Sequence, residues 1–186
     1  MSRFKIADTR LAGLKVIDRD RRRDSRGFLC RLFCSEDLRQ AGWERPVVQV
    51  NHTMTHQTGA LRGMHFQHYP HSEMKMIVCL RGEVFDVAID LRAESSTFLR
   101  WHAERLSSEN GRALLIPEGF AHGFQALTDN CELLYLHTAS YAPLAEGAIN
   151  SQDPRVGIDW PLSITDRSDR DCAIPFLAPD FSGLIV

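Results

Sequence analysis

The stretch LRGMHFQHYPHSEMKMIVCLRGEVFDVAID, residues 61–90, carries apolar segments with the spacing of β-strands and places basic side chains between them. Side chains in residues 61–67 alternate between two faces, as they do in a strand. The apolar segments 74–81 and 83–90 flank Arg81 and Gly82, a pair that predicts a tight turn and hence a β-hairpin. The stretch predicts an antiparallel sheet, in which one face can hold a core while the other lines a cavity.

Lys75 is the least expected residue of this stretch. The chain has only three lysines among its 22 basic side chains, and Lys75 lies between Met74 and Met76 in an apolar segment. An unpaired buried ammonium group is costly in free energy. We therefore expect Lys75 to have a function.

Arg62 and His65 are three residues apart, so a regular strand would place them on opposite faces. A site that uses both side chains requires a bulge or a twist between them. Gly63 is the residue type that often marks such a bulge. We expect the strand to be irregular there.

The rest of the chain has the pattern of short strands separated by turns. We expect strands at residues 14–17, 27–33, 46–51, 98–106, 112–116 and 132–138. One short capped helix is expected at 35–41, ending at Gly42, with a helical turn possible at 166–172. The charged cluster 18–27 and the glycine-containing segment 117–124 are expected to be loops. An all-β fold, a sandwich or barrel forming one domain over residues 1–186, fits this pattern.

Composition excludes several classes of partner. The formal net charge of −2 gives no basic surface for nucleic acid. The five cysteines are odd in number and form no CxxC pair, which favours a reducing, cytoplasmic compartment. The first ten residues, MSRFKIADTR, contain no apolar signal segment, and no apolar run is long enough to cross a membrane. We expect a soluble protein.

Gln49 and Asn51 are two residues apart in a predicted strand and thus share one face. Two amides on one face can form a hydrogen-bonding surface for a ligand. The pattern fits an outer, solvated face equally well. Both readings stay open.

Residues 111–122 resemble the second sequence motif of the cupin superfamily, with Gly111, Pro117, Gly119 and His122 at matching positions. In the first cupin motif, a glutamate that binds a metal precedes a glycine by the spacing that separates Lys75 from Gly82 here. A cation in this position opposes metal binding. The resemblance therefore implies a cupin barrel that needs no metal or other cofactor.

Longer strings resemble the dTDP-4-dehydrorhamnose 3,5-epimerase family over roughly residues 10–176, among them DSRGF, VQVNH, LRGMHFQ, LRGEVFDVAIDLR and LSSENGRALLIPEGFAHGFQ. The resemblance implies a jelly-roll β-barrel with short peripheral helices and a loop-rich C-terminal segment. It also implies a homodimer that exchanges N-terminal strand contacts. The implied reaction inverts two carbons of a nucleotide-linked 4-keto-6-deoxyhexose in dTDP-rhamnose biosynthesis.

The resemblance assigns catalytic roles to four residues. His65 matches the general base, Asp171 the carboxylate that orients it, Tyr135 the general acid, and Lys75 the cation near the keto oxygen. Imidazole suits the role of base because its pKa lies near the working pH, and fixed positive charge stabilises an enolate. The positions matched to substrate binding are Arg26, Gln49, Asn51, Arg62, His122, Glu146 and Arg170.

Residues common in the family are replaced at several positions, among them Arg22, Arg31, Asn150 and Ser151. The first two match positions that contact the nucleotide and the last two match positions at the sugar pocket. These differences bear on which sugar nucleotide is accepted and on how many carbons are inverted.

Alternative functions are a single-carbon epimerase, a ketoisomerase and a non-catalytic cupin that binds a sugar nucleotide. A metal-dependent cupin would use His65, His71, His122 and Glu73, and Lys75 argues against it. Four further histidines are assigned structural roles: His52, His56, His102 and His137.

Overall fold

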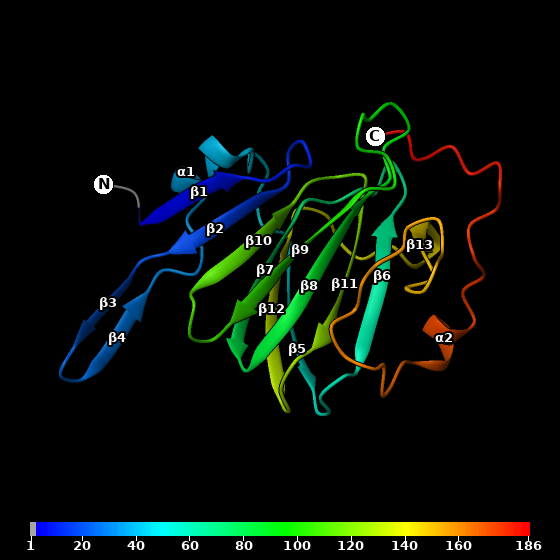
Figure 1. Cartoon of the computed structure of the whole chain (residues 1–186). Coiled ribbons are helices and arrows are strands. Elements are labelled where there is room, and N and C mark those ends of the chain that lie inside the picture. Colours follow the sequence, from blue (N-terminus) through cyan, green and yellow to red (C-terminus); the bar gives the residue numbers. More distant parts are fainter. Residues whose placement is uncertain (1–2) are drawn as a thin grey trace.

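The computed structural model describes residues 3–186, which form two antiparallel sheets packed face to face (Figure 1). The first sheet contains, in order, β1 (Phe4–Asp8), β2 (Lys15–Arg19), β10 (Arg112–Ile116), β7 (Lys75–Arg81), β12 (Cys131–His137) and β5 (Gln49–Thr55). The second contains β13 (Glu146–Ala148), β6 (Leu61–Gln67), β11 (Phe120–Ala126), β8 (Glu83–Asp90) and β9 (Trp101–Ser107). The predicted all-β jelly-roll barrel is confirmed.

Short elements surround the barrel. Strands β3 (Arg21–Asp24) and β4 (Gly27–Cys30) form a separate hairpin that projects from the body (Figure 1). The helical turns are α1 (Ser35–Leu38), η1 (Arg39–Ala41), η2 (Pro143–Ala145) and α2 (Asp169–Cys172). Within residues 3–186, no helix is long and apolar enough to span a membrane. The five cysteines are all free thiols.

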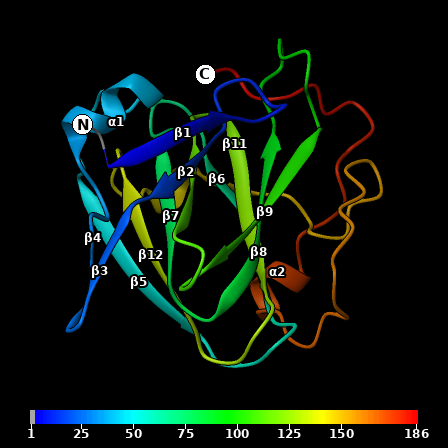
Figure 2. The same cartoon turned by 60° about the vertical axis from the view of Figure 1, so that its left-hand side comes forward.

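Apolar side chains pack in three layers because both sheets are also covered on their outer faces. Ile77 lies between the sheets, whereas its neighbours Met76 and Val78 pack outward with Trp43. The outer face of the second sheet packs against the C-terminal segment, including Leu184. Figure 2 shows α1 on the side of the first sheet and the C-terminal segment, orange to red, on the side of the second. β7 is apolar on both faces for this reason.

The predicted hairpin of residues 74–81 and 83–90 is wrong, although both segments are strands. β7 pairs with β10 and β12 in the first sheet, whereas β8 pairs with β9 and β11 in the second. Gly82, with φ of +74°, lies where the chain passes from one sheet to the other. A short turn between apolar segments fits a corner between two sheets as well as a hairpin.

Two segments expected to be loops are strands. The charged cluster 18–27 forms the end of β2 and most of the β3–β4 hairpin, whose backbone pairing leaves Arg22, Arg23 and Asp24 exposed. Residues 120–126 form β11, which is buried along its whole length between β6 and β8. Gly119, with φ of +79°, makes the turn before β11, whereas Gly123 lies inside the strand and allows close packing against β6.

Other boundaries differ less. β5 (Gln49–Thr55) starts and ends later than the strand expected at 46–51. β13 was not predicted. The helical turns at 35–41 end at Gly42 with φ of +95°, as predicted. The prediction of a capped N-terminus is wrong, because Cys34 occupies the N-cap position and no side chain caps the helix. The predicted turn at 166–172 is confirmed by α2.

β6 carries the irregularity predicted near Gly63. Its register with β11 shifts so that His65 faces His122 while Arg62 faces Phe124, three residues on β6 against two on β11. Gly63 itself has φ of +124°. As a result, Arg62 and His65 line the same cavity.

Replacement of Gly63 by alanine is expected to lower the free energy of unfolding by roughly 2–4 kcal/mol. A Cβ atom there would lie 2.5 Å from Cα of Gly123, and φ is unfavourable for residues with a side chain. Urea denaturation measures the change. Gly157→Ala is the matched control, because its φ is also positive but the nearest atom to a new Cβ is 3.9 Å away. Equal losses in both variants would contradict the role of close packing at Gly63.

Candidate active site

A cavity of about 880 Å³ opens between the two sheets. Ten of the eleven predicted site residues line it: Gln49, Asn51, Arg62, His65, Lys75, His122, Tyr135, Glu146, Arg170 and Asp171. The exception is Arg26, which lies at the turn of the β3–β4 hairpin, pairs with Asp24 and has a side chain that is 88% exposed. The structure brings the other predicted residues together from separate parts of the chain.

The wall formed by the first sheet has polar side chains in two adjacent rows. Strand pairing places Gln49 beside His137 and Lys75 in one row, and Asn51 beside Tyr135 in the next. Gln49 Nε2 donates a hydrogen bond to Asn51 Oδ1 over 3.1 Å. Both amides line the cavity. Their spacing therefore marks a surface that can bind a ligand instead of an outer, solvated face.

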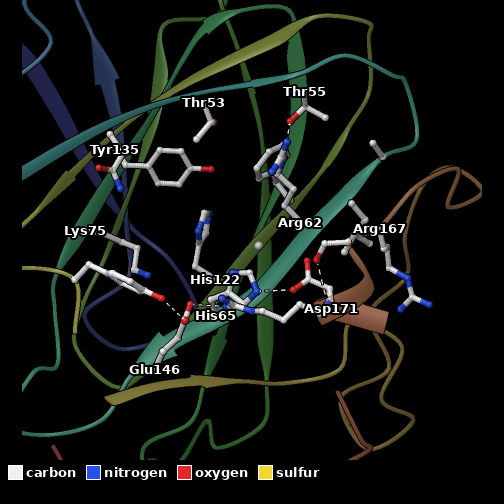
Figure 3. A pocket seen from close by; sticks show the side chains of 18 of the residues that line it. Thr53, Thr55, Arg62, His65, Lys75, His122, Tyr135, Glu146, Arg167 and Asp171 are labelled. Carbon is white, nitrogen blue, oxygen red and sulfur yellow. Dashed lines mark hydrogen bonds and ion pairs between the residues drawn. The ribbon is translucent and has the colours of Figure 1, made fainter. Parts of the chain in front are cut away.

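His65 pairs with Asp171 on the opposite wall. His65 Nε2 lies 2.7 Å from Asp171 Oδ1, and Asp171 is 4% exposed (Figure 3). Burial acts to raise the pKa of Asp171, but the hydrogen bond and charge of His65, with a further bond from the Gly63 backbone, lower it overall. An ionised carboxylate only accepts, so the proton of the ring belongs on Nε2 and Nδ1 is left with a lone pair. His65 is thus arranged as a base.

α2 places Asp171 in this position. Ser168, which precedes the helical turn, accepts a hydrogen bond from the Asp171 backbone N–H over 3.1 Å. The Gly63 backbone N–H points to the same carboxylate at 3.5 Å. The C-terminal segment therefore closes over β6 and supplies the partner of His65.

Tyr135 enters the cavity from β12, on the other wall from His65 (Figure 3). Its ring contacts His122 edge to face, with centroids 5.9 Å apart, and His122 Nε2 lies 2.9 Å from the buried Asp86. Burial, together with the charge of Asp86, raises the pKa of Tyr135 well above its usual value. The phenol consequently keeps its proton until a reaction removes it, as a general acid must.

Lys75 has a buried partner that sequence reasoning did not assign to it. Its Nζ lies 2.9 Å from Glu73, whose second oxygen lies 2.8 Å from His137 Nδ1. Glu73 and His137 both line the cavity, although the sequence suggested Glu73 only as a metal ligand and His137 as structural. Their spacing was a usable signal, because each is two residues from a predicted catalytic residue in a strand region.

Charged and polar groups also form the rim. Glu146 accepts hydrogen bonds from the Tyr141 hydroxyl at 2.7 Å and from Arg170 at 2.5 Å. Burial would raise the pKa of Glu146, but Arg170 and Tyr141 lower it. Elsewhere in the cavity, Arg62 donates through Nε to Thr55 Oγ1 over 3.0 Å (Figure 3). The cavity combines acid–base groups with fixed cations, which suits an anionic substrate that loses a proton.

Comparison with known proteins identifies the family. The model of the family described as dTDP-4-dehydrorhamnose 3,5-epimerase matches residues 8–179. The chain belongs to this family. An epimerase of that name from Methanothermobacter thermautotrophicus is 42% identical over 166 residues, which are 89% of each chain.

Other members of the family extend the comparison. The crystal structure of the 3,5-epimerase from Legionella pneumophila in complex with dTDP-4-keto-L-rhamnose is 38% identical and superposes with a TM-score of 0.88, covering 93% of this chain and 92% of that one. A dTDP-4-dehydro-6-deoxyglucose 3-epimerase from Streptomyces bikiniensis is 41% identical over 83% of this chain and 80% of its own. Relatives that differ in the number of inverted carbons thus share a similar degree of identity with this chain.

The ligand set of a metal-dependent cupin does not come together. His71 lies outside the cavity wall, whereas His65, His122 and Glu73 each pair with an ionisable side chain. Within residues 3–186, no cluster of three histidine, cysteine or acidic side chains has an arrangement that could hold a metal. The hypothesis that these four residues form a metal site is wrong.

The residues Arg22, Arg31, Asn150 and Ser151, which replace common family residues, do not line the cavity. Arg31 pairs with Asp37 at 3.0 Å, and Arg22 lies on the exposed hairpin. Asn150 donates to the Ile174 carbonyl, and the Ser151 carbonyl accepts from Trp160. Asn150 and Ser151 therefore fix the C-terminal segment instead of contacting a ligand directly.

Proposed function

We propose that the chain converts dTDP-4-dehydro-6-deoxy-D-glucose to dTDP-4-dehydro-L-rhamnose by inverting the two carbons beside the ketone. The observation that carries the proposal is the pairing of His65 with ionised Asp171, across the cavity from a protonated Tyr135. Membership of the family and the ligand named for the Legionella pneumophila relative support this choice of substrate.

The reaction needs a base on one face of the sugar ring and an acid on the other. Nδ1 of His65 takes the proton from the carbon, and the electrons of the C–H bond form the double bond of an enolate, leaving negative charge on the keto oxygen. Lys75 stabilises that oxygen, while Asp171 stabilises the imidazolium. Tyr135 then protonates the carbon from the opposite face. Exchange with solvent returns a proton to Tyr135 and removes one from His65.

The remaining cavity groups bind the nucleotide sugar in this proposal. Arg62 offers a cation for the diphosphate, and Gln49 and Asn51 offer amide donors and acceptors. Glu146 and Arg170 form an ion pair in the cavity lining, where they offer a carboxylate and a guanidinium group to the substrate. His122, fixed by Asp86, supports the face of Tyr135.

Product analysis tests the proposed reaction. The purified protein is incubated with dTDP-4-keto-6-deoxy-D-glucose, the ketone is reduced with borohydride, and the released 6-deoxyhexoses are identified by chromatography against standards. Inversion of both carbons gives rhamnose and 6-deoxytalose. Sugars inverted only at C3 would point to the activity named for the Streptomyces bikiniensis relative, and unchanged configuration would contradict the proposal.

We also propose that the working form is a homodimer in which Arg26 binds the diphosphate in the partner's cavity. Arg26 lies outside its own cavity on a hairpin that projects from the body (Figure 1). The same hairpin exposes Phe28 and Leu29, which are 57% and 61% accessible. Exposed apolar residues on a projecting strand suit contact with a second copy.

Mixing two inactive variants tests this arrangement. Arg26→Ala and His65→Ala are each expected to lose most activity, but a mixed dimer has one cavity with both native residues. After joint refolding, activity is expected to recover to about one quarter of the native value, because half of the dimers are mixed and each has one intact site. Absence of recovery, with mixed dimers demonstrated by mass spectrometry, would show that Arg26 does not act across an interface.

A further inference from the structure

Lys75, Glu73 and His137 form a closed group in the cavity wall. The Glu73 carboxylate uses one oxygen for each partner: Oε1 lies 2.9 Å from Lys75 Nζ, and Oε2 lies 2.8 Å from His137 Nδ1. The side chains are 7%, 10% and 10% exposed for Lys75, Glu73 and His137. Within residues 3–186, Glu73 is the one acidic residue that forms an ion pair with Lys75.

The contacts fix the charge of Glu73 and the ring nitrogen through which His137 donates to it. Burial acts to raise the pKa of Glu73, but the hydrogen bond from His137 and the charge of Lys75 lower it to about 2. Glu73 is therefore a carboxylate, which accepts from both neighbours. Since a carboxylate cannot donate, His137 carries hydrogen on Nδ1, and in the neutral ring the lone pair lies on Nε2. That nitrogen is buried and has no hydrogen-bond partner within the described residues.

His137 also packs against Tyr135 and lies beside Lys75 in the first sheet. Its ring stacks on Tyr135 with an interplanar angle of 7° and centroids 6.0 Å apart. Strand pairing places His137 directly beside Lys75. The imidazole is thus fixed by Tyr135 on one side and by Glu73 on the other, so its N–H has little freedom to leave the carboxylate.

We propose that Glu73 and His137 are positioning residues for Lys75. Glu73 keeps the ammonium charged and directed at the keto oxygen, and His137 keeps Glu73 in the orientation that this requires. The inference rests on the proposed function, because it concerns the cation that stabilises the enolate.

A buried lysine can lose its ability to stabilise an enolate for two physical reasons. Without a counter-charge, burial favours the neutral amine, which cannot stabilise an enolate by charge. With a mobile counter-charge, the ammonium could follow the carboxylate away from the substrate. A carboxylate held at both oxygens avoids both failures, in the way that a carboxylate fixes the imidazole of a catalytic triad.

Three variants test the inference through the kinetics of the native reaction. In Glu73→Gln the carboxylate is lost but the shape is kept. We expect kcat to fall about 10- to 100-fold with KM within about twofold, because the interaction acts on the transition state. The alkaline limb of the kcat profile is expected to move to lower pH. This variant leaves the other titratable groups of the cavity in place: Asp86, which interacts with the charge of Lys75, and the lining residues Tyr135, His122, His65 and Glu146.

The His137 variants separate positioning from packing. His137→Leu keeps the bulk and removes the N–H, so it is expected to reproduce part of the loss seen in Glu73→Gln. His137→Gln keeps a donor for Glu73 and is expected to restore most of kcat. Thermal unfolding of each variant verifies folding. Equal kcat in His137→Leu and His137→Gln, or a native kcat and pH profile in Glu73→Gln, would overturn the inference.

A measurement without substrate keeps the inference distinct from the proposed function. Nitrogen-15 NMR of histidine-labelled protein reports which ring nitrogen of His137 carries hydrogen, with His137→Gln used to assign the signal. We expect hydrogen on Nδ1 in the native protein and a changed signal in Glu73→Gln. Hydrogen on Nε2 in the native protein would overturn the inference even if the enzyme is active. Absence of reaction in the native protein would instead contradict the proposed function.

Discussion

Replacement of His65 by alanine is expected to stop the transfer of deuterium from heavy water to the carbons beside the ketone. Nδ1 of His65 is the free basic atom of the pair with Asp171, and the variant leaves no base at that place. Loss of a general base typically costs 100- to 10,000-fold, so exchange should fall at least about 100-fold. Proton NMR of the sugar nucleotide, recorded over time in heavy water, measures the rate.

His71→Ala is the matched control for His65→Ala. His71 is an exposed histidine outside the cavity wall, and it belonged to the ligand set of the metal hypothesis. Exchange in this variant should equal that of the native protein. Native exchange in His65→Ala would exclude His65 as the base, and loss of exchange in both variants would indicate a general effect on the fold.

Replacement of Tyr135 by phenylalanine is expected to separate proton removal from inversion. The base and Lys75 remain, so a proton should still leave the carbon. The opposite face loses its donor, and deuterium should return mainly on the face from which the proton left. We expect net inversion to fall about 100-fold or more while exchange persists. Product configuration and deuterium content, measured on the same sample, give the ratio.

Tyr141→Phe controls for the loss of a hydroxyl in the same cavity. The Tyr141 hydroxyl donates to Glu146 at the rim, so its removal should raise KM and leave the ratio of inversion to exchange unchanged. Equal yields of inverted product from Tyr135→Phe and the native protein would remove the acid role from Tyr135.

Sequence patterns predicted most strands because their apolar and polar residues repeat with the period of a β-strand. Residues 112–116 form β10 with the predicted limits, and the irregularity at Gly63 follows from the need to bring Arg62 and His65 together. Patterns failed where tertiary contacts decide the outcome. The corner at Gly82 and the buried strand β11 depend on which sheet each segment joins, and that information is not local.

Some contacts of the candidate site could also be predicted from sequence, whereas others depend on the fold. The pair of His65 with Asp171 was predicted through resemblance to a family, because the two residues are far apart in sequence and only the fold brings them together. The partners of Lys75 could have been predicted from the two-residue period of a strand. Glu73 lies two residues from Lys75, and His137 lies two residues from Tyr135. The position of Arg26 outside its own cavity could not be inferred from sequence, because it depends on how the β3–β4 hairpin projects.

The most direct test of the epimerase mechanism is proton NMR of dTDP-4-keto-6-deoxy-D-glucose with the native protein in heavy water. Deuterium is followed separately at C3 and C5, the two carbons beside the ketone. The arrangement of His65, Lys75 and Tyr135 predicts incorporation at both carbons with formation of the L-rhamno product. Incorporation at one carbon would restrict the activity to a single centre, and a spectrum without deuterium at either carbon would contradict the proposed epimerase.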